Sequence, residues 1–206
     1  MSKMMKRLSI AALLAGAIGS GTANAALFSF SRITNNGAQN LASQFLIDVQ
    51  SVNATTVNFI VSNTGPLASS IAAVYFDDRL NSLLNDLVSL APSAGVNFSE
   101  GGSPPNLPGG NPVNFDDDFR ATSNGPIING INPNESLGIR FSLFNGVTFA
   151  NVISAMNNGD LRLGIHVQAL PDGQSDSFIT TEPIPSPTAS MLGLVGLALA
   201  GVMRRR

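Results

Sequence analysis

The sequence predicts an all-β fold, an antiparallel β-sandwich or jelly-roll-like domain with one or two short helical turns. Short segments alternate apolar and polar residues with a period of two, and clusters of Gly, Asn and Pro separate them. The regular alternation of strands with helices that would indicate a parallel sheet is missing from the sequence. We divide the chain into a leader (1–25), a body (26–181) and a tail (182–206). A body of that length can bury one core.

Residues 1–25 are predicted to be a secretory signal peptide. A start rich in Lys and Arg is followed by an apolar stretch too short to span a bilayer. Ala23 and Ala25 then provide the small residues of a cleavage site. Signal peptidase is therefore expected to cut after Ala25, and the mature chain is expected to begin at Ala26.

The first half of the body contains four candidate strands, around residues 28–30, 45–49, 57–61 and 71–76. In the third of these, Val57, Phe59 and Val61 fall on one face, while polar residues take most of the other face. This alternation is typical of a half-buried strand in an antiparallel sheet.

The segment RLNSLLNDLVSL, residues 79–90, departs from the period of two. Its apolar residues recur at helical spacing, which predicts a short helix or helical turn; they are Leu80, Leu83, Leu84, Leu87 and Val88.

The next segment, EGGSPPNLPGGNP at residues 100–112, has four prolines and four glycines and cannot form regular structure. It is expected to cap one end of the sandwich.

The second half of the body has a strand candidate at residues 137–144 and a second possible helical turn at 148–157. The segment LRLGIHVQAL is the clearest strand, because every second residue from Leu161 to Ala169 is apolar. The other face of this strand carries His166, and we expect it to be the less buried of the two faces. PDGQSDS follows as a predicted hairpin turn.

The tail ends in an apolar segment and a basic cluster. Fifteen uncharged residues run from Ala189 to Met203, which makes roughly 22 Å of helix against a hydrocarbon core of about 30 Å. The chain then stops at Arg204, Arg205 and Arg206. Cytoplasmic loops favour such charges, so the body would lie outside the membrane.

A Pro-rich lead, a short hydrophobic helix and a terminal Arg cluster resemble the PEP-CTERM sorting signal of bacterial envelope proteins. The resemblance implies recognition by an exosortase-type membrane protease, removal of the helix, and delivery of the body to the cell surface or extracellular matrix. An ordinary C-terminal anchor that stays in place is the alternative. The segments SIAAVYFDD, GVNFSEGGSPPNLPGG and LGIHVQALPDGQSDSF also resemble one group of extracellular PEP-CTERM proteins without an established activity.

The Pro-Glu-Pro position of that signal can be aligned in two ways. Pro185, Ser186 and Pro187 give both prolines, with serine where glutamate is usual. Glu182 and Pro183 instead keep the glutamate but lack the first proline. The sequence leaves both alignments open.

The composition of the body excludes several partners. It has five arginines, no lysine and twelve acidic residues, which gives a formal net charge of −7. Such a surface is a poor partner for nucleic acids and anionic membranes. The chain has no cysteine, so disulfides, thiol catalysis and cysteine metal sites are excluded.

The sequence offers no recognisable catalytic constellation. His166 is the only histidine, and no G-x-S-x-G motif marks a nucleophile beside it. The chain has no tryptophan, and its twelve phenylalanines mostly sit in apolar alternation, so we assign them to the core. Any glycan binding would then be polar and edge-on, through Asn, Asp and Gln. No cofactor and no enzymatic activity are predicted.

Clustered aspartates are the weak candidates for calcium, which takes six to eight oxygen ligands. They are Asp77, Asp78, Asp116, Asp117 and Asp118. No EF-hand-type loop surrounds them, and solvated turns are the simpler interpretation. We therefore expect an exported protein with a structural or adhesive role and with extracellular polysaccharide as a candidate partner. A carbohydrate-active enzyme and a calcium-stabilised adhesin are the alternatives.

Overall fold

The computed structural model describes residues 25–184, which form an all-β domain with one α-helix, as the sequence predicts. The helix is α1 (Phe149–Asn158), and short 3-10 turns lie at η1 (Ala42–Gln44), η2 (Asn111–Val113) and η3 (Ile127–Asn129). The strands are β1 (Ala25–Arg32), β2 (Phe45–Asn53), β3 (Thr56–Asn63), β4 (Ser70–Asp78), β5 (Leu84–Pro92), β6 (Phe98–Glu100), β7 (Phe119–Ser123), β8 (Glu135–Leu143), β9 (Leu161–Gln168) and β10 (Asp176–Ile184).

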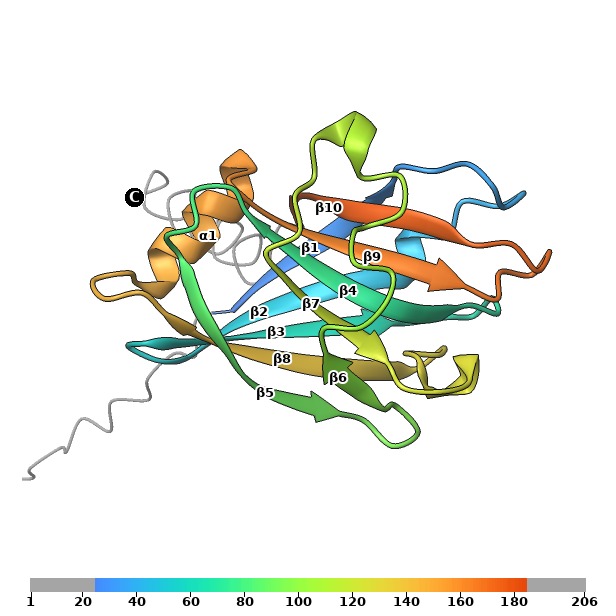
Figure 1. Ribbon diagram of the computed structural model, residues 1–206, viewed down its shortest axis with the longest axis horizontal. Coiled ribbons are helices and arrows are strands. Elements are labelled where there is room, and N and C mark those ends of the chain that lie inside the picture. The colour runs from blue at the N-terminus through green and yellow to red at the C-terminus, as the bar shows by residue number, and fades with distance from the viewer. Residues whose placement is uncertain (1–24, 185–206) are drawn as a thin grey trace, which may run out of the picture.

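The strands form one antiparallel sheet in the order β5-β8-β3-β2-β1-β10-β9-β4-β7-β6. The sheet curls until its two edge strands, β5 and β6, contact each other (Figure 1). The result is a nearly closed, barrel-like sandwich. Curling brings the edges of the sheet together and leaves little unpaired strand for association with other chains.

The core fills the inside of this curled sheet, as the alternating residues predict. Phe59 on β3, Phe76 on β4 and Phe141 on β8 are fully buried and meet edge to face, with ring centroids 4.7 to 5.9 Å apart. Since β3 and β4 are distant in the sheet order, this aromatic cluster joins its opposite walls.

The helical turn predicted at residues 148–157 is confirmed as α1. Thr148 caps its first turn, because its side chain accepts from the backbone of Asn151 while the Asn151 side chain accepts from the backbone of Thr148. Gly159 ends it with a φ of 79°, a left-handed conformation that glycine adopts without strain. Val152 and Met156 are buried against the core.

The helix predicted within residues 79–90 is wrong, because this segment enters β5. Two β-bulges interrupt its pairing with β8, and each places an extra residue in β5. The inward residues are therefore Leu84, Leu87 and Leu90, opposite Leu143, Phe141 and Ile139. A spacing of three resembles a helix face in the sequence, although the backbone is extended.

Residues 101–118, here called the covering loop, do not cap an end of the sandwich as predicted. They cross the outer face of β4 and β9, where Leu107 and Phe115 pack with Ala73 and Tyr75 in a second, smaller core. Figure 1 shows the covering loop running across these strands between β6 and β7. The run IAAVYF, residues 71–76 of β4, is accordingly apolar in consecutive positions, because β4 is buried on both faces.

Polar contacts fasten the covering loop to the sheet. The Tyr75 hydroxyl donates to the carbonyl oxygen of Pro104 at 3.1 Å, and Thr122 donates to the carbonyl of Gly101 at 2.8 Å. The Arg120 guanidinium donates to the carbonyls of Gly102 and Pro105. This coverage also buries His166, which is 8% exposed, although its face is still the less buried one, as predicted, because Leu161, Leu163, Ile165 and Val167 on the other face are fully buried.

Candidate functional site

The two ends of the described chain lie side by side. β1 pairs with β10, and Leu27 is the register partner of Ile184. The predicted leader and tail therefore join the domain at the same end of the barrel. Ala25 is the first residue of β1, whereas Ala23 and the rest of the leader lie outside the described residues.

The predicted sorting residues divide at the end of β10. Glu182 and Pro183 belong to β10, and Pro183 pairs with Phe28. The remaining sorting residues lie outside the described part of the chain; they are Pro185, Ser186, Pro187, Arg204, Arg205 and Arg206. The apolar tail segment, at 189–203, is outside it too. Across residues 25–184, no helix has the length and apolar character needed to cross a membrane.

An apolar groove of about 680 Å³ opens beside the chain ends. Ala25 and Ala26 of β1 form one wall, and Phe149 and Ile153 of α1 form the other. No charged side chain lines it. The groove therefore adjoins the bond at which signal peptidase is expected to cut.

The structure brings two of the predicted calcium regions together. The end of β4 and the segment before β7 meet because Phe76 pairs with Phe119. They form a surface hollow of about 220 Å³ whose lining residues are Asp77, Arg79, Asn81, Asn114, Asp116 and Asp118. Asp78 and Asp117 do not line it.

Protein groups engage most of these carboxylates. Oδ2 of Asp77 accepts from the guanidinium of Arg162. Oδ2 of Asp78 accepts the backbone N–H groups of Leu83 and Leu84 at 2.8 and 3.0 Å, which fixes the turn into β5. These partners engage one oxygen of each carboxylate, whereas Oδ1 of Asp77 and Oδ1 of Asp78 are buried with no hydrogen-bond partner among the described residues.

Asp117 and Asp118 likewise turn toward protein donors. Asp117 forms a 2.8 Å ion pair with Arg120, and Asp118 accepts the backbone N–H of Asp78 at 2.7 Å. Burial raises the pKa of Asp118, and burial raises that of Asp117 to about 6 against the opposing effect of Arg120. Within residues 25–184, no group of three or more His, Cys, Asp or Glu side chains is arranged to hold a metal ion.

His166 lines a small polar cavity on the outer face of the sheet. The cavity measures about 180 Å³ and lies where β4 and β9 meet the covering loop and the turn after β7. Its lining residues are Ala72, Ala73, Ser103, Pro104, Ser123, Gly125, Ile127, His166 and Gln168. Nδ1 of His166 is buried without a hydrogen-bond partner, as is Oγ of Ser177, the cross-strand partner of His166 on β10.

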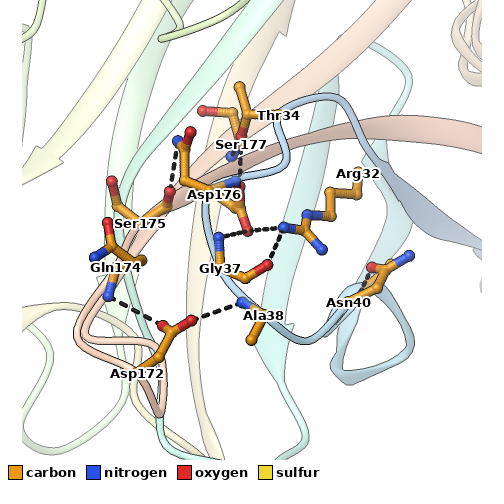
Figure 2. Close-up of polar contacts among 12 residues, drawn as sticks. Arg32, Thr34, Gly37, Ala38, Asn40, Asp172, Gln174, Ser175, Asp176 and Ser177 are labelled. Atoms are coloured by element: carbon orange, nitrogen blue, oxygen red, sulfur yellow. Dashed lines mark hydrogen bonds and ion pairs between the residues drawn. The ribbon is translucent and has the colours of Figure 1, made fainter.

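The sequence did not predict the role of Asp176, the most connected carboxylate of the domain. It is 1% exposed and accepts from the hydroxyl of Thr34 and the backbone N–H groups of Asn36 and Gly37. It also forms a 2.8 Å ion pair with Arg32 (Figure 2). Asp176 thus ties the loop after β1 to β10, and it is structural rather than catalytic.

Asp172, in the confirmed hairpin turn between β9 and β10, supports the same loop. Its carboxylate accepts the backbone N–H groups of Ala38 and Gln174, and these contacts lower its pKa (Figure 2). The partners of Asp172 and Asp176 in the loop after β1 lie more than 130 residues away in the chain. No local pattern could have predicted them.

Searches against protein-family models, curated proteins and solved structures found no match to this chain. The functional argument therefore depends on the residues and their geometry.

Proposed function

We propose that this protein is exported, sorted through its C-terminal signal, and delivered to the cell envelope or extracellular matrix of a bacterium, with a structural or adhesive, non-enzymatic role. The pairing of Leu27 with Ile184 is the observation that carries the proposal. A leader and a tail that both engage a membrane can do so together when they leave a domain at one end. The rest of the barrel is then held away from that membrane.

The end of β10 favours one alignment of the sorting motif. A membrane protease must bind its recognition motif as an accessible segment. Glu182 and Pro183 are part of a strand that pairs with β1, whereas Pro185 to Pro187 directly follow that strand. Binding of the motif with Ser186 by an exosortase-type protease would therefore not require β10 to separate from β1.

The charge and the contacts of the body support a non-enzymatic role. With −7 charges and no lysine, its surface is suited to neutral extracellular partners rather than nucleic acids. Asp77, Asp78, Asp117 and Asp118 each accept from backbone or arginine donors. These carboxylates stabilise turns and ion pairs, while a glycosidase needs two that face a substrate across a cleft.

The hollow between β4 and β7 favours a second candidate, the calcium-stabilised adhesin. Asp77, Asp116 and Asp118 line it together, although Arg79 brings a positive charge to the same surface. A cation bound there would need solvent or a partner to complete its oxygen ligands.

The experiment that tests the proposal transfers the tail to an exported reporter. Residues 182–206, fused behind the reporter, are expected to hold it in the membrane of a host without exosortase. With the protease present, the reporter is expected to be released in a shortened form. A matched fusion in which Arg204, Arg205 and Arg206 are replaced by serine should be retained less well, because the cytoplasmic charges are lost. Release at full length would contradict sorting.

A further inference from the structure

The His166 cavity combines features of a small ligand site that the fold itself does not require. Its lining is mostly polar, and it comes from four separate segments: β4, the covering loop, the β7 turn and β9. Its volume, about 180 Å³, is roughly that of six water molecules in the liquid. A cavity assembled in this way can enclose one ring-sized polar group.

The chemistry of the lining selects for a neutral ligand. No acidic side chain and no Lys or Arg belongs to it. A charged ligand would thus lose its hydration without gaining a partner of opposite charge. Burial lowers the pKa of His166, which keeps the imidazole neutral near pH 7. Apolar ligands are disfavoured as well, because they would leave these polar groups unsatisfied.

The polar groups of the cavity suit hydroxyl groups in particular. The hydroxyls of Ser103 and Ser123, the amide of Gln168 and the neutral imidazole of His166 can together donate and accept hydrogen bonds. A sugar hydroxyl also does both. Nδ1 of His166 is buried with no hydrogen-bond partner among residues 25–184. Within the same residues, no Phe, Tyr or Trp side chain lines the cavity, so a sugar would bind by its edge.

We infer that the cavity lined by Ser103, Ser123, His166 and Gln168 binds one neutral sugar residue of an extracellular polysaccharide. The source of the sugar rests on the proposed function, but the binding itself does not. The cavity would let the exported body adhere to a matrix polymer at the face covered by residues 101–118.

The test uses nuclear magnetic resonance of untagged residues 26–184, which are the body together with the last residues of β10, with His166 as the single histidine probe. The probes are glucose, galactose, mannose and xylose, together with their neutral trisaccharides; a trisaccharide of uronic acids is the charged comparison. At least one neutral sugar is expected to shift the His166 ring signals in a saturable way. The charged comparison is expected to leave them unchanged.

Two variants locate the binding. Ala72→Leu fills the cavity, and Gln168→Ala removes a polar group, so each is expected to weaken binding at least tenfold. The matched controls, Ala54→Leu and Gln39→Ala, change exposed residues that do not line the cavity and should bind as the wild type does. Circular dichroism verifies that every variant is folded.

Absence of a saturable His166 shift with every neutral sugar would overturn the inference and leave a cavity that holds water only. Equal affinity in Ala72→Leu, if that variant is folded, would overturn it as well, and Gln168→Ala decides the matter should Ala72→Leu fail to fold. The reporter fusion described above contains no part of the cavity. Failure of sorting and failure of sugar binding are therefore distinguishable.

Discussion

Asp176 has the most demanding environment of any carboxylate in the described domain. Its side chain is fully buried, and Arg32, which neutralises it, is itself only 10% exposed. The hydroxyl of Thr34 and two backbone N–H groups supply the remaining hydrogen bonds. Charge-assisted bonds of this kind are stronger than neutral ones, and losing one partner leaves the other charge buried without compensation.

Replacing this carboxylate should strongly destabilise the domain. Asp176→Ala is expected to lower the free energy of unfolding by about 3–5 kcal/mol, because Arg32 loses its partner. Urea unfolding of the purified body measures this change. Asp86→Ala, at an exposed position of β5, is the matched control and should stay within about 0.5 kcal/mol of the wild type. A small effect of Asp176→Ala would mean that the loop after β1 is not held by this contact.

Asp117 makes a pH-dependent contribution to stability. Burial raises its pKa from 3.8 to about 6, so the folded protein binds this proton more tightly than the unfolded chain does. Its contribution is therefore fully present below pH 3.8 and is lost as the pH rises through about 6. His166 acts in the opposite direction: its pKa is lowered from 6.5 by burial, so stability is lost as the pH falls below 6.5.

Comparison of Asp117→Asn with the wild type isolates the pH-dependent contribution of Asp117 to stability. The stability of the wild type relative to the variant should fall between pH 4 and pH 6 and then stay constant, because His166 is common to both proteins. Urea unfolding across this range measures the difference. A difference that does not depend on pH would show that Asp117 titrates normally.

The covering loop is the element that gives the domain its second core. Gly164 of β9 lies directly beneath it, and a Cβ atom there would come within 2.6 Å of Leu107 Cδ2 and 3.1 Å of Phe115 Cζ. Both neighbours are buried, so neither can move aside without disturbing the packing. Glycine is therefore required at this position because the covering loop packs too close to β9 for a Cβ atom, and not because of the backbone conformation of residue 164.

Gly164→Ala should loosen the covering loop. We expect a loss of about 1–3 kcal/mol from overpacking. Burial raises the pKa of Tyr75, the only tyrosine, and exposure in the variant should return it toward 10. Alkaline absorbance titration follows this single phenol. Gly138→Ala is the matched control, since a Cβ there would be 3.4 Å from its nearest neighbours. An unchanged Tyr75 titration in Gly164→Ala would contradict the role assigned to the loop.

The elements also show what the sequence could predict. Alternation identified β3 and β9, and helical spacing identified α1, because each pattern reports one uninterrupted local geometry. The bulges of β5 changed its inward spacing to three, so the same rule predicted a helix. Proline and glycine content marked the covering loop as irregular, but only the buried outer face of β4 and β9 determines where it packs.

At the scale of the whole molecule, the position of the chain ends follows from the sheet order. The first and last strands are neighbours at the centre of the sheet, and β10 runs antiparallel to β1. Because Ala25 and Ala26 pair with Gln50 and Val49, the bond between them lies within a paired strand once the domain has folded. Signal peptidase should therefore cut before β1 pairs, and protein sequencing of the exported form should find Ala26 first.

The aspartate hollow makes the metal dependence of the whole fold a direct test between the proposed function and the adhesin. We expect the body to have the same melting temperature in calcium and in EDTA at equal ionic strength, because its core and its buried ion pairs form between protein groups alone. Calcium that binds only the native state, at 100 times its dissociation constant, would add about 2.7 kcal/mol. For a domain of this size, that gain corresponds to a rise of roughly 5–11 °C.

Asp116→Asn assigns any calcium effect to the hollow. Asp116 is an exposed member of its lining, so the substitution should leave stability in EDTA unchanged. Asp160→Asn, at a half-buried position that does not line the hollow, controls for the loss of one negative charge. A calcium-dependent rise in melting temperature that Asp116→Asn abolishes and Asp160→Asn preserves would favour the calcium-stabilised adhesin. Equal melting temperatures in all three proteins would leave packing as the source of stability, since the chain has no cysteine to form a disulfide.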